Sequence, residues 1–370
     1  MFSTRKPIRE GTVVGRGLRA GPVRLLLALA VLVVALSGCQ AGPGPLPARA
    51  GTPGHVFVIN LENQGYDRVF GSTSSMPYLA GTLRSQGVLL TNYYGIAHDS
   101  LPDYLAQISG QPPNASTVKD CPTFIPFTPS GTDSQGRLLG TGCVYPPNVP
   151  TLAGQLSGAG KTWKGYMEDM QSPCLHPALG APDDHRTATR ADQYSTHHNP
   201  FVYFRSITDS PDCATNVVNY TSLATDLQAV GTTPNLSYIT PNLCHDAHDS
   251  PCADGNAGGL GAADAWLKSE VPAILDSPAF KQDGMLVITL DEADSGRAGP
   301  INGMPGGTAG GQVGALILSP FSPQGGTSSK PYNHYSLLAS MEDFFNVPRL
   351  AGAAETGVTA FGADVYKAHA

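Results

Sequence analysis

The chain has 370 residues and carries 22 Lys and Arg against 29 Asp and Glu, a formal net charge of −7. Six of the basic residues and one of the acidic residues lie within residues 1–39, so the remainder has 16 basic and 28 acidic side chains and a formal charge of −12. Such a surface does not attract nucleic acid or anionic lipid by charge. We therefore expect no nucleic-acid partner.

Residues 1–39 have the pattern of an export signal. Arg16, Arg19 and Arg24 precede an apolar run from Leu25 to Leu36. This run has the length of a signal-peptide core and is too short to span a bilayer comfortably. The run ends in Leu36-Ser37-Gly38-Cys39 and resembles the lipobox of bacterial lipoproteins, in which the cysteine is lipidated and becomes the first mature residue. We expect an exported protein, held by lipid on Cys39 at the outer face of the bacterial cell membrane. The alternative is secretion after cleavage nearby.

The rest of the chain is divided into a tether, one domain and a short end. Residues 40–54 are rich in Pro, Gly and Ala without apolar periodicity, which indicates a flexible tether. Residues 55–350 have a size that a single α/β domain reaches, and residues 351–370 are expected as a C-terminal extension. The sequence does not fix the oligomeric state.

Hydrophobic periodicity predicts strands that alternate with helices. In chain order, the expected elements are strand 55–61, helix 76–86, strand 88–93, helix 100–110, helix 151–158, strand 162–167, strand 236–240, helix 262–275, strand 285–290, strand 313–318 and helix 335–345. Residues 121–150 and 174–199 lack periodicity and are expected as loop insertions. The alternation predicts an α/β fold with a mainly parallel sheet and helices on both faces.

Six cysteines remain after Cys39. An even number in an exported chain predicts three disulfides, which would tie the loop insertions. The spacing that zinc sites require, such as Cys-x-x-Cys, does not occur. The simplest pairing joins neighbours along the chain, although the sequence alone leaves the connectivity open: Cys121–Cys143, Cys174–Cys213 and Cys244–Cys252.

Two apolar strands end directly on acidic dipeptides. The run 55–61 is followed by Glu62-Asn63, and the run 285–290 by Asp291-Glu292. Ligands of open α/β sheets bind at the carboxyl ends of the strands, so we expect both dipeptides at the same edge. Carboxylate and amide oxygens gathered at one place suit a divalent cation, although either dipeptide alone would more simply start a turn.

Ser100 begins the predicted helix that Gly110 ends. The order Ser100-Leu101-Pro102-Asp103 is typical of a helix start, with Ser100 as the N-cap and Asp103 at the capping-box position. A hydroxyl there lies beside unpaired N–H groups and the positive end of the helix dipole, which is an anion site. Near a divalent cation, such a hydroxyl can be deprotonated and attack phosphorus. Without the carboxylates, a plain N-cap is the simpler interpretation.

Histidines are candidates for the general acid and for contacts to the phosphate. His197 and His198 lie in one loop cluster, and His245 and His248 follow the predicted strand 236–240. Both clusters are expected beside the proposed edge, where a general acid for a leaving alkoxide is needed. His98 precedes the predicted helix and either contacts the same phosphate or faces solvent.

Several blocks together resemble the bacterial phosphoesterase family, which contains acid phosphatases and non-specific phospholipases C and has an alkaline-phosphatase-like α/β fold. They occur in the expected order along nearly all of the mature chain. The blocks are 62–71, 98–104, 194–201, 238–248, 291–292 and 334–342. Asp103 stands where the family commonly has Asn, so the role of that residue is open.

The resemblance implies roles for individual residues. It implies one divalent metal ion bound by Glu62, Asn63, Asp291 and Glu292, with the nucleophile Ser100 on the same ion. His198 and His248 would hydrogen-bond the phosphate or protonate the leaving group. Candidate substrate contacts are His98, His197, Asn199 and His245.

These features favour a metal-dependent phosphomonoesterase of the acid phosphatase type, which hydrolyses phosphate monoesters through a phosphoserine intermediate. The expected substrate is a small phosphate ester, with a phosphoinositide or another phospholipid head group as one option. The alternative is a phospholipase C-type phosphodiesterase acting on phospholipids, for which the chain is short. A catalytically inactive binding lipoprotein is disfavoured by the intact residue set, and a sulfatase by the absence of the Cys/Ser-x-Pro-x-Arg signature.

Overall fold

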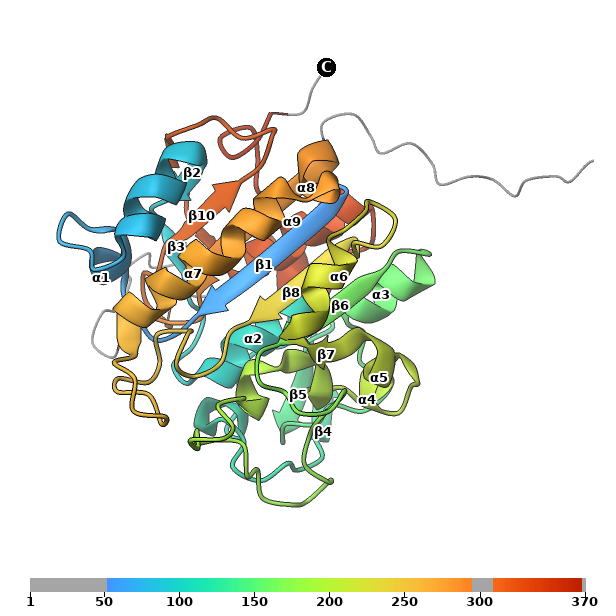
Figure 1. Ribbon diagram of the computed structural model, residues 1–370. Helices are drawn as coiled ribbons and strands as arrows, with labels where there is room; N and C mark the ends of the chain where they lie inside the picture. Colours follow the sequence, from blue (N-terminus) through green and yellow to red (C-terminus); the bar gives the residue numbers. More distant parts are fainter. Residues whose placement is uncertain (1–51, 295–308, 368–370) are drawn as a thin grey trace, which may run out of the picture. The chain divides into compact units, whose positions relative to one another are not determined.

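The computed structural model describes residues 52–294 and 309–367, which are drawn in colour in Figure 1. The predicted export signal, Cys39 and tether residues 40–51 lie outside the described residues. Within the two described segments, we find no helix that is long and apolar enough to cross a membrane.

An eight-stranded sheet forms the centre of the fold, with the strand order β11-β2-β10-β9-β1-β8-β6-β7 (Figure 1). Its strands are β1 (His55–Leu61), β2 (Val88–Leu90), β6 (Trp163–Met167), β7 (Val217–Asn219), β8 (Leu236–Thr240), β9 (Gly284–Leu290), β10 (Ala315–Leu318) and β11 (Gly326–Ser328). Two small pairs lie outside it: β3 (Tyr93–Tyr94) with β12 (Tyr332–Asn333), and β4 (Thr128–Thr132) with β5 (Leu138–Thr141).

The central strands run parallel and are fully buried. β1 lies between its parallel partners β8 and β9, and β6 and β7 continue in the same direction. β10 is antiparallel to both β9 and β2. Every residue of β1, β8, β9 and β10 is buried, as continuous apolar runs require when both faces of a sheet are covered. The predicted α/β fold with a mainly parallel sheet is confirmed.

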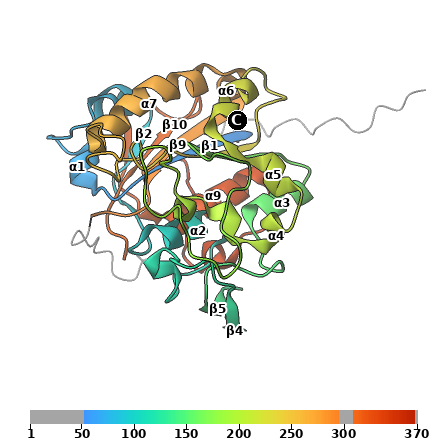
Figure 2. The same ribbon diagram turned by 60° about the horizontal axis from the view of Figure 1, so that its bottom comes forward.

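Helices cover both faces of the sheet (Figure 2). One face carries α7 (Gly259–Asp276), α8 (Pro278–Asp283) and the helical turn η1 (Tyr78–Leu83). The other carries α2 (Ser100–Ser109), α3 (Leu152–Gly158) and α9 (His334–Phe345), which pack together. The shorter helices are α1 (Tyr66–Phe70), α4 (Arg205–Thr208), α5 (Asp212–Asn216) and α6 (Leu223–Asp226).

Three predicted elements differ from the structure. The predicted helix 76–86 is two irregular turns, η1 and η2 (Arg84–Gln86), rather than a regular α-helix. The predicted strand 88–93 is divided into β2 and β3 at Thr91 and Asn92, whose side chains bond to the carbonyls of Ser328, the last residue of β11, and Ser329. The stretch 121–150 contains the hairpin β4–β5, which is exposed along β4. A solvent-exposed hairpin buries little apolar surface and therefore leaves a weak periodic signal.

All three predicted disulfides are present, and each lies outside the strands of the large sheet. They are Cys121–Cys143, Cys174–Cys213 and Cys244–Cys252. The chain beyond α9 also packs on the core, where Ala353, Val358, Phe361 and Val365 are buried.

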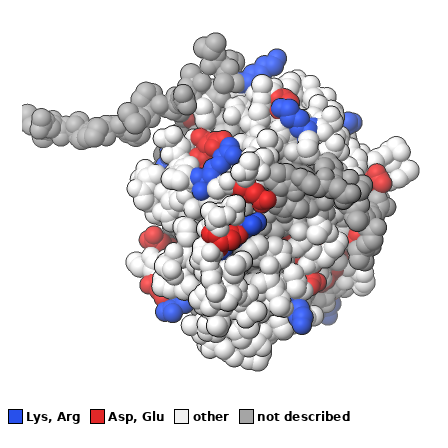
Figure 3. All heavy atoms as spheres, turned by 180° about the vertical axis from the view of Figure 1, so that it is seen from behind, with Lys and Arg blue, Asp and Glu red and all other residues white. Residues whose placement is uncertain are grey.

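Charged side chains are scattered over the described surface. On the face shown in Figure 3, blue and red groups are small, and several lie next to each other. Surface pairs of this kind include Arg137 with Asp133 at 2.6 Å and Arg349 with Asp343 at 2.7 Å. The described part of that face has no continuous basic patch, which agrees with the acidic balance of the sequence.

Candidate functional site

The carboxyl ends of β1 and β9 bring the two acidic dipeptides together. Leu61, the last residue of β1, pairs in parallel with Leu290, the last residue of β9. Glu62 and Asp291 follow directly. The backbone N–H of Asn63 donates to Asp291 Oδ1 at 3.0 Å, and Asn63 adopts a left-handed φ of 53° where the chain leaves the strand. The two dipeptides therefore lie at one edge of the sheet, as expected.

Glu62 is the centre of the site. It is fully buried, and its Oε2 accepts a hydrogen bond from Ser100 Oγ at 2.9 Å. The Tyr104 hydroxyl donates to Glu62 Oε1, and His198 Nε2 lies 3.5 Å from Glu62 Oε2. Burial raises the pKa of Glu62 well above its usual value, and the charges of two neighbouring acids raise it further.

Ser100 is the first residue of α2 rather than its cap. The N-cap is Asp99, which has a φ of 61° and makes no side-chain capping bond. The predicted capping box is wrong, because Asp103 turns back and accepts the N–H of Ile96 at 2.6 Å. The Ser100 hydroxyl instead donates to the carboxylate of Glu62, which directly follows β1. A left-handed non-glycine residue directly before it marks local strain of the kind found at functional sites.

Asp120 holds the start of α2 from outside the helix. Its Oδ1 accepts the backbone N–H of Leu101 at 2.9 Å. Asp120 and Cys121 both have left-handed backbones, with φ of 50° and 48°, and Cys121 is tied to Cys143 by a disulfide. Burial raises the pKa of Asp120 to about 7. The turn that carries Ser100 is thus fixed by a covalently anchored loop.

A buried imidazole lies between two carboxylates. His198 Nδ1 is 3.3 Å from Asp246 Oδ2, its Nε2 faces Glu62, and its ring is stacked on Tyr104. Burial lowers the pKa of His198 well below its usual value, so the ring is neutral at ordinary pH. The sequence did not single out Asp246 as a site residue. It lies in the loop after β8, and the position of β8 beside β1 brings this loop to Glu62.

The chemistry of this cluster fits a divalent cation. Ligand atoms of Glu62, His198 and Asp246 all lie within 4.8 Å of one another. Asp246 Oδ2, Asp291 Oδ2 and both ring nitrogens of His198 are buried and have no hydrogen bond to any described residue, because the contacts of His198 lack hydrogen-bond geometry. Buried polar atoms without partners are costly, and carboxylate oxygens with an imidazole are common ligands of divalent metals.

Two other predicted ligands have protein partners. Glu292 Oε2 contacts His98 Nδ1 at the rim, where the His98 side chain is 42% exposed. Burial and the charge of Asp291 raise the pKa of Glu292 to about 10. The side-chain amide of Asn63 donates to Glu62 Oε2 at 3.4 Å.

The remaining candidate residues divide into two groups. The rings of His197 and His248 lie 4.4 and 6.0 Å from the ring of His198, so these two residues border the cluster. His245 instead pairs with Glu168 at 2.9 Å. Asn199 is buried, and its side-chain amide donates to the hydroxyl of Tyr194. This bond joins two parts of the same loop. The structure therefore does not bring the side chains of His245 and Asn199 into the cluster.

His334 supports the site from α9. Its Nε2 lies 2.6 Å from the backbone carbonyl oxygen of Asp291 and 3.3 Å from Asp103 Oδ1, while Nδ1 lies 3.1 Å from the Tyr93 hydroxyl. Burial raises the pKa of Asp103 to about 6. Periodicity placed the helix but gave no sign of this contact, which depends on how α2 and α9 pack.

Comparison with known proteins finds one matching family model and several similar phosphatases. Residues 75–348 match the model of the Phosphoesterase family. The chain is 29% identical to "Phosphate-repressible acid phosphatase" of Penicillium chrysogenum over 72% of this chain and 54% of that protein. It is 27% identical to "Probable acid phosphatase" of Kluyveromyces lactis, over 80% and 58%. The chain thus spans little more than half the length of these fungal relatives.

A bacterial relative has a similar length. The chain is 26% identical to "Phosphatidylinositol-3-phosphatase" of Mycobacterium tuberculosis over 88% of this chain and 89% of that protein. Among solved structures, a protein in the alkaline phosphatase superfamily from Vibrio parahaemolyticus aligns with a TM-score of 0.48 and 13% identity, covering 85% of this chain and 74% of that chain.

Proposed function

Because the chain belongs to the phosphoesterase family, we propose that it is a metal-dependent phosphomonoesterase of the acid phosphatase type that acts through a phosphoserine. The observation that carries this proposal is the 2.9 Å hydrogen bond from Ser100 Oγ to Glu62 Oε2, inside the buried cluster of acids and imidazole. A serine that only capped a helix would accept a bond from a backbone N–H of its own first turn.

Ser100 is the proposed nucleophile. Its Oγ bonds to phosphorus while the bond from phosphorus to the ester oxygen breaks, and water later cleaves the phosphoserine to release inorganic phosphate. The start of α2 offers backbone N–H groups and the positive end of the helix dipole to the phosphoryl oxygens. A divalent cation held by Glu62, His198, Asp246 and Asp291 would lower the pKa of the serine hydroxyl and offset the negative charge of the phosphate.

His248 is the proposed proton donor to the leaving alcohol. Its side chain is 37% exposed, and its Nδ1 lies 2.8 Å from Asp249 Oδ1. This contact orients the ring, with Nε2 on its opposite side for a substrate. His198 is less suited to donate a proton because burial keeps it neutral, so we assign it to binding.

The proposed substrate is a small phosphate monoester. Relatives named as acid phosphatases and as a phosphatidylinositol-3-phosphatase support this class, and the latter makes a phosphoinositide head group a natural candidate. We also propose that the protein is exported and carries lipid on Cys39. The three disulfides support an oxidising compartment, and mass spectrometry of the native N-terminus tests the lipid.

The purified full chain tests the enzymatic proposal. We expect hydrolysis of p-nitrophenyl phosphate, little hydrolysis of bis(p-nitrophenyl) phosphate, and loss of activity on chelation that an added divalent cation reverses. Faster cleavage of the diester would favour the phospholipase C-type alternative. Undiminished turnover after exhaustive metal removal would contradict the metal-dependent mechanism.

A further inference from the structure

Tyr104 lies one helical turn after Ser100, and both side chains bond to the same carboxylate. Residues four apart lie on one face of an α-helix, and α2 contains both residues. Ser100 Oγ donates to Glu62 Oε2 at 2.9 Å, and the Tyr104 hydroxyl donates to Glu62 Oε1. Both oxygens of Glu62 are therefore held by one face of one helix.

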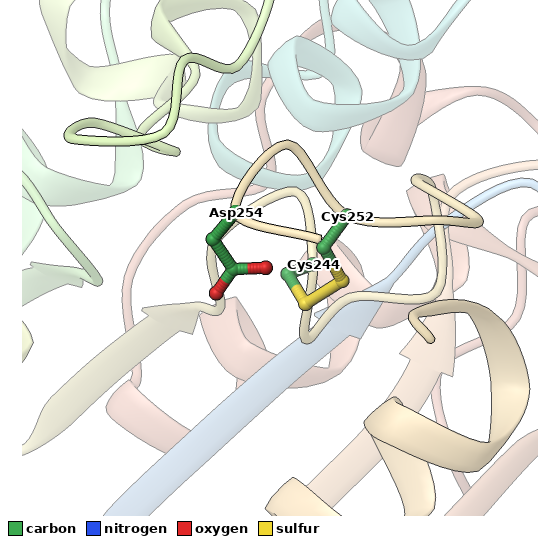
Figure 4. Close-up of side chains that lie close together, drawn as sticks. All are labelled: Cys244, Cys252 and Asp254. Carbon is green, nitrogen blue, oxygen red and sulfur yellow. A yellow bond between two sulfur atoms is a disulfide. The ribbon is translucent and has the colours of Figure 1, made fainter. Parts of the chain in front are cut away.

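The backbone of Glu62 is fixed by the loop after β8. Its N–H donates to the carbonyl of Asp246 at 2.7 Å. Asp246 lies within the loop that the Cys244–Cys252 disulfide closes, with Asp254 alongside (Figure 4). Rotation of the carboxylate is less restricted than the backbone, because the last torsion of a glutamate side chain has a broad, two-fold preference. The orientation of the carboxylate therefore depends on the hydrogen bonds to its two oxygens.

The ring of Tyr104 also supports the imidazole of His198. The two rings are stacked, with centroids 5.3 Å apart and planes 6° from parallel. Tyr238 of β8 packs against the Tyr104 ring in a T-shaped arrangement, with centroids 6.5 Å apart. Tyr104 is fully buried, so close packing restrains its ring. One side chain thus contacts two members of the cluster, Glu62 through its hydroxyl and His198 through its ring.

We propose that Tyr104 is a positioning residue that keeps Glu62 Oε2 directed at Ser100 and at a cation bound in the cluster. The inference rests on the proposed function. With Oε1 engaged by Tyr104, Oε2 is the oxygen that meets Ser100 and lies 3.5 Å from His198 Nε2. The bond from Ser100 is lost when its hydroxyl attacks phosphorus. The bond from Tyr104 takes no part in that step and holds the carboxylate throughout.

Tyr104→Phe tests this role because it removes the hydroxyl and keeps the ring that stacks on His198. Tyr238→Phe is the matched control. It also deletes the hydroxyl of a fully buried tyrosine that packs under α2, and the partner of that hydroxyl is Gln107 Oε1, at 3.0 Å, rather than an acid of the cluster. If Tyr104 only stabilised the fold, both variants would lose similar stability and neither would change the site.

Calorimetric titration with Mn²⁺, which carboxylate oxygens suit, measures cation binding without turnover. After removal of metal by chelation, we expect Tyr104→Phe to bind Mn²⁺ about 10–100-fold more weakly than the wild type, the range for residues that orient a metal ligand. Tyr238→Phe should bind like the wild type. At saturating Mn²⁺, Tyr104→Phe should lower kcat for p-nitrophenyl phosphate by about tenfold and leave KM nearly unchanged. Equal losses in the two variants, or no loss in Tyr104→Phe, would overturn the proposal.

Crystal structures of the wild type and both variants separate this inference from the enzymatic proposal. We expect the Glu62 carboxylate to turn in Tyr104→Phe and its bond from Ser100 to break, and both to be retained in Tyr238→Phe. If the wild type binds no Mn²⁺ and hydrolyses no ester, the proposed function fails, while this comparison still decides the role of Tyr104. A Glu62 carboxylate that keeps its orientation in Tyr104→Phe would refute the inference even in an active, metal-dependent enzyme.

Discussion

At Ser100, the hydroxyl and the backbone serve different partners. The backbone starts α2, whereas the hydroxyl bonds to Glu62, which directly follows β1. The residue before it is held at a φ of 61°, a conformation that costs free energy for a non-glycine residue. The arrangement is hard to explain as helix capping, and it presents a nucleophile at the carboxyl edge of the sheet.

Ser100→Ala should therefore remove turnover and leave the fold intact. Alanine is the best helix former, so the melting temperature should be close to that of the wild type. We expect turnover of p-nitrophenyl phosphate to fall on the order of 10³-fold or more, as for other nucleophiles. Ser109→Ala is the matched control, because this buried serine of the same helix bonds to the backbone of Leu105 and Gln111 and not to the acids of the cluster. Near-wild-type turnover of Ser100→Ala would reduce Ser100 to a structural residue.

Asp246 offers a second test at the residue scale. Asp246→Asn keeps the size of the side chain and removes the charge that faces His198 at 3.3 Å. If Asp246 is a ligand of a divalent cation, calorimetric titration should show an affinity lower by at least about 10–100-fold, the range for residues that only support the ligands of a metal. Asp133→Asn, on the exposed hairpin, should titrate like the wild type. Equal affinities of Asp246→Asn and the wild type would place the metal elsewhere.

At the scale of elements, the start of α2 is controlled by the loop that carries Asp120. The Asp120 side chain holds the N–H of Leu101, next to the proposed nucleophile. We expect Asp120→Ala to lower kcat by about tenfold, because misplacing a reacting group by a fraction of an ångström weakens positioning. KM should change little.

Asp120→Asn separates positioning from charge. The amide retains an acceptor oxygen for Leu101, so Asp120→Asn should recover most of the kcat that Asp120→Ala loses. Both variants are compared with the wild type by steady-state kinetics and thermal unfolding. If kcat falls only in proportion to the unfolded fraction at the assay temperature, Asp120 merely stabilises the helix.

Elements with unbroken apolar runs could be predicted from the sequence, and those that depend on packing could not. The bounds of β8 agree with the expected strand 236–240, because a run buried on both faces leaves a strong signal. Gly110 ends α2 at a φ of 69°, as expected of a left-handed glycine cap. The antiparallel direction of β10 has no local signal, since either direction buries the same apolar residues.

The residues of the candidate site also divide into those with a local sequence signal and those that depend on packing. The strand-end acids Glu62 and Asp291 were predicted to meet, and they do so because neighbouring parallel strands end together. Asp246 needed the strand order, which places β8 beside β1. The contact of His334 with Asp103 needed the packing of α9 on α2. Acids that directly follow an apolar strand could thus be found from the sequence, whereas contacts that depend on strand order or on helix packing could not.

At the scale of the whole molecule, buried acids make stability depend on pH, and Glu342 is an acid away from the proposed metal site. It lies on α9 and is fully buried. Its Oε1 accepts the N–H of Leu350 at 2.9 Å, and its Oε2 has no hydrogen bond to any described residue. Burial raises the pKa of Glu342 from its usual value to about 9. The folded protein therefore keeps a proton that the unfolded chain releases.

The proton on Glu342 determines whether stability rises or falls with pH. Between the unfolded pKa of about 4.3 and the folded pKa of about 9, the unfolded state binds fewer protons, so stability falls as pH rises. Glu342→Gln keeps an acceptor for Leu350 and cannot ionise, so this part of the fall should disappear. We expect the free energy of unfolding of Glu342→Gln to exceed that of the wild type by an amount that grows from pH 5 to pH 9 and reaches on the order of a few kcal/mol.

Urea denaturation of both proteins at pH 5, 7 and 9 measures this difference directly. The other buried acids titrate in both proteins, so their contributions cancel when the two curves are subtracted. Glu355→Gln is the control, since this acid is only partly buried and pairs with Arg137 at 3.3 Å, and its curve should run parallel to that of the wild type. Parallel curves for Glu342→Gln and the wild type would mean that Glu342 loses its proton in the folded protein near the same pH as in the unfolded chain.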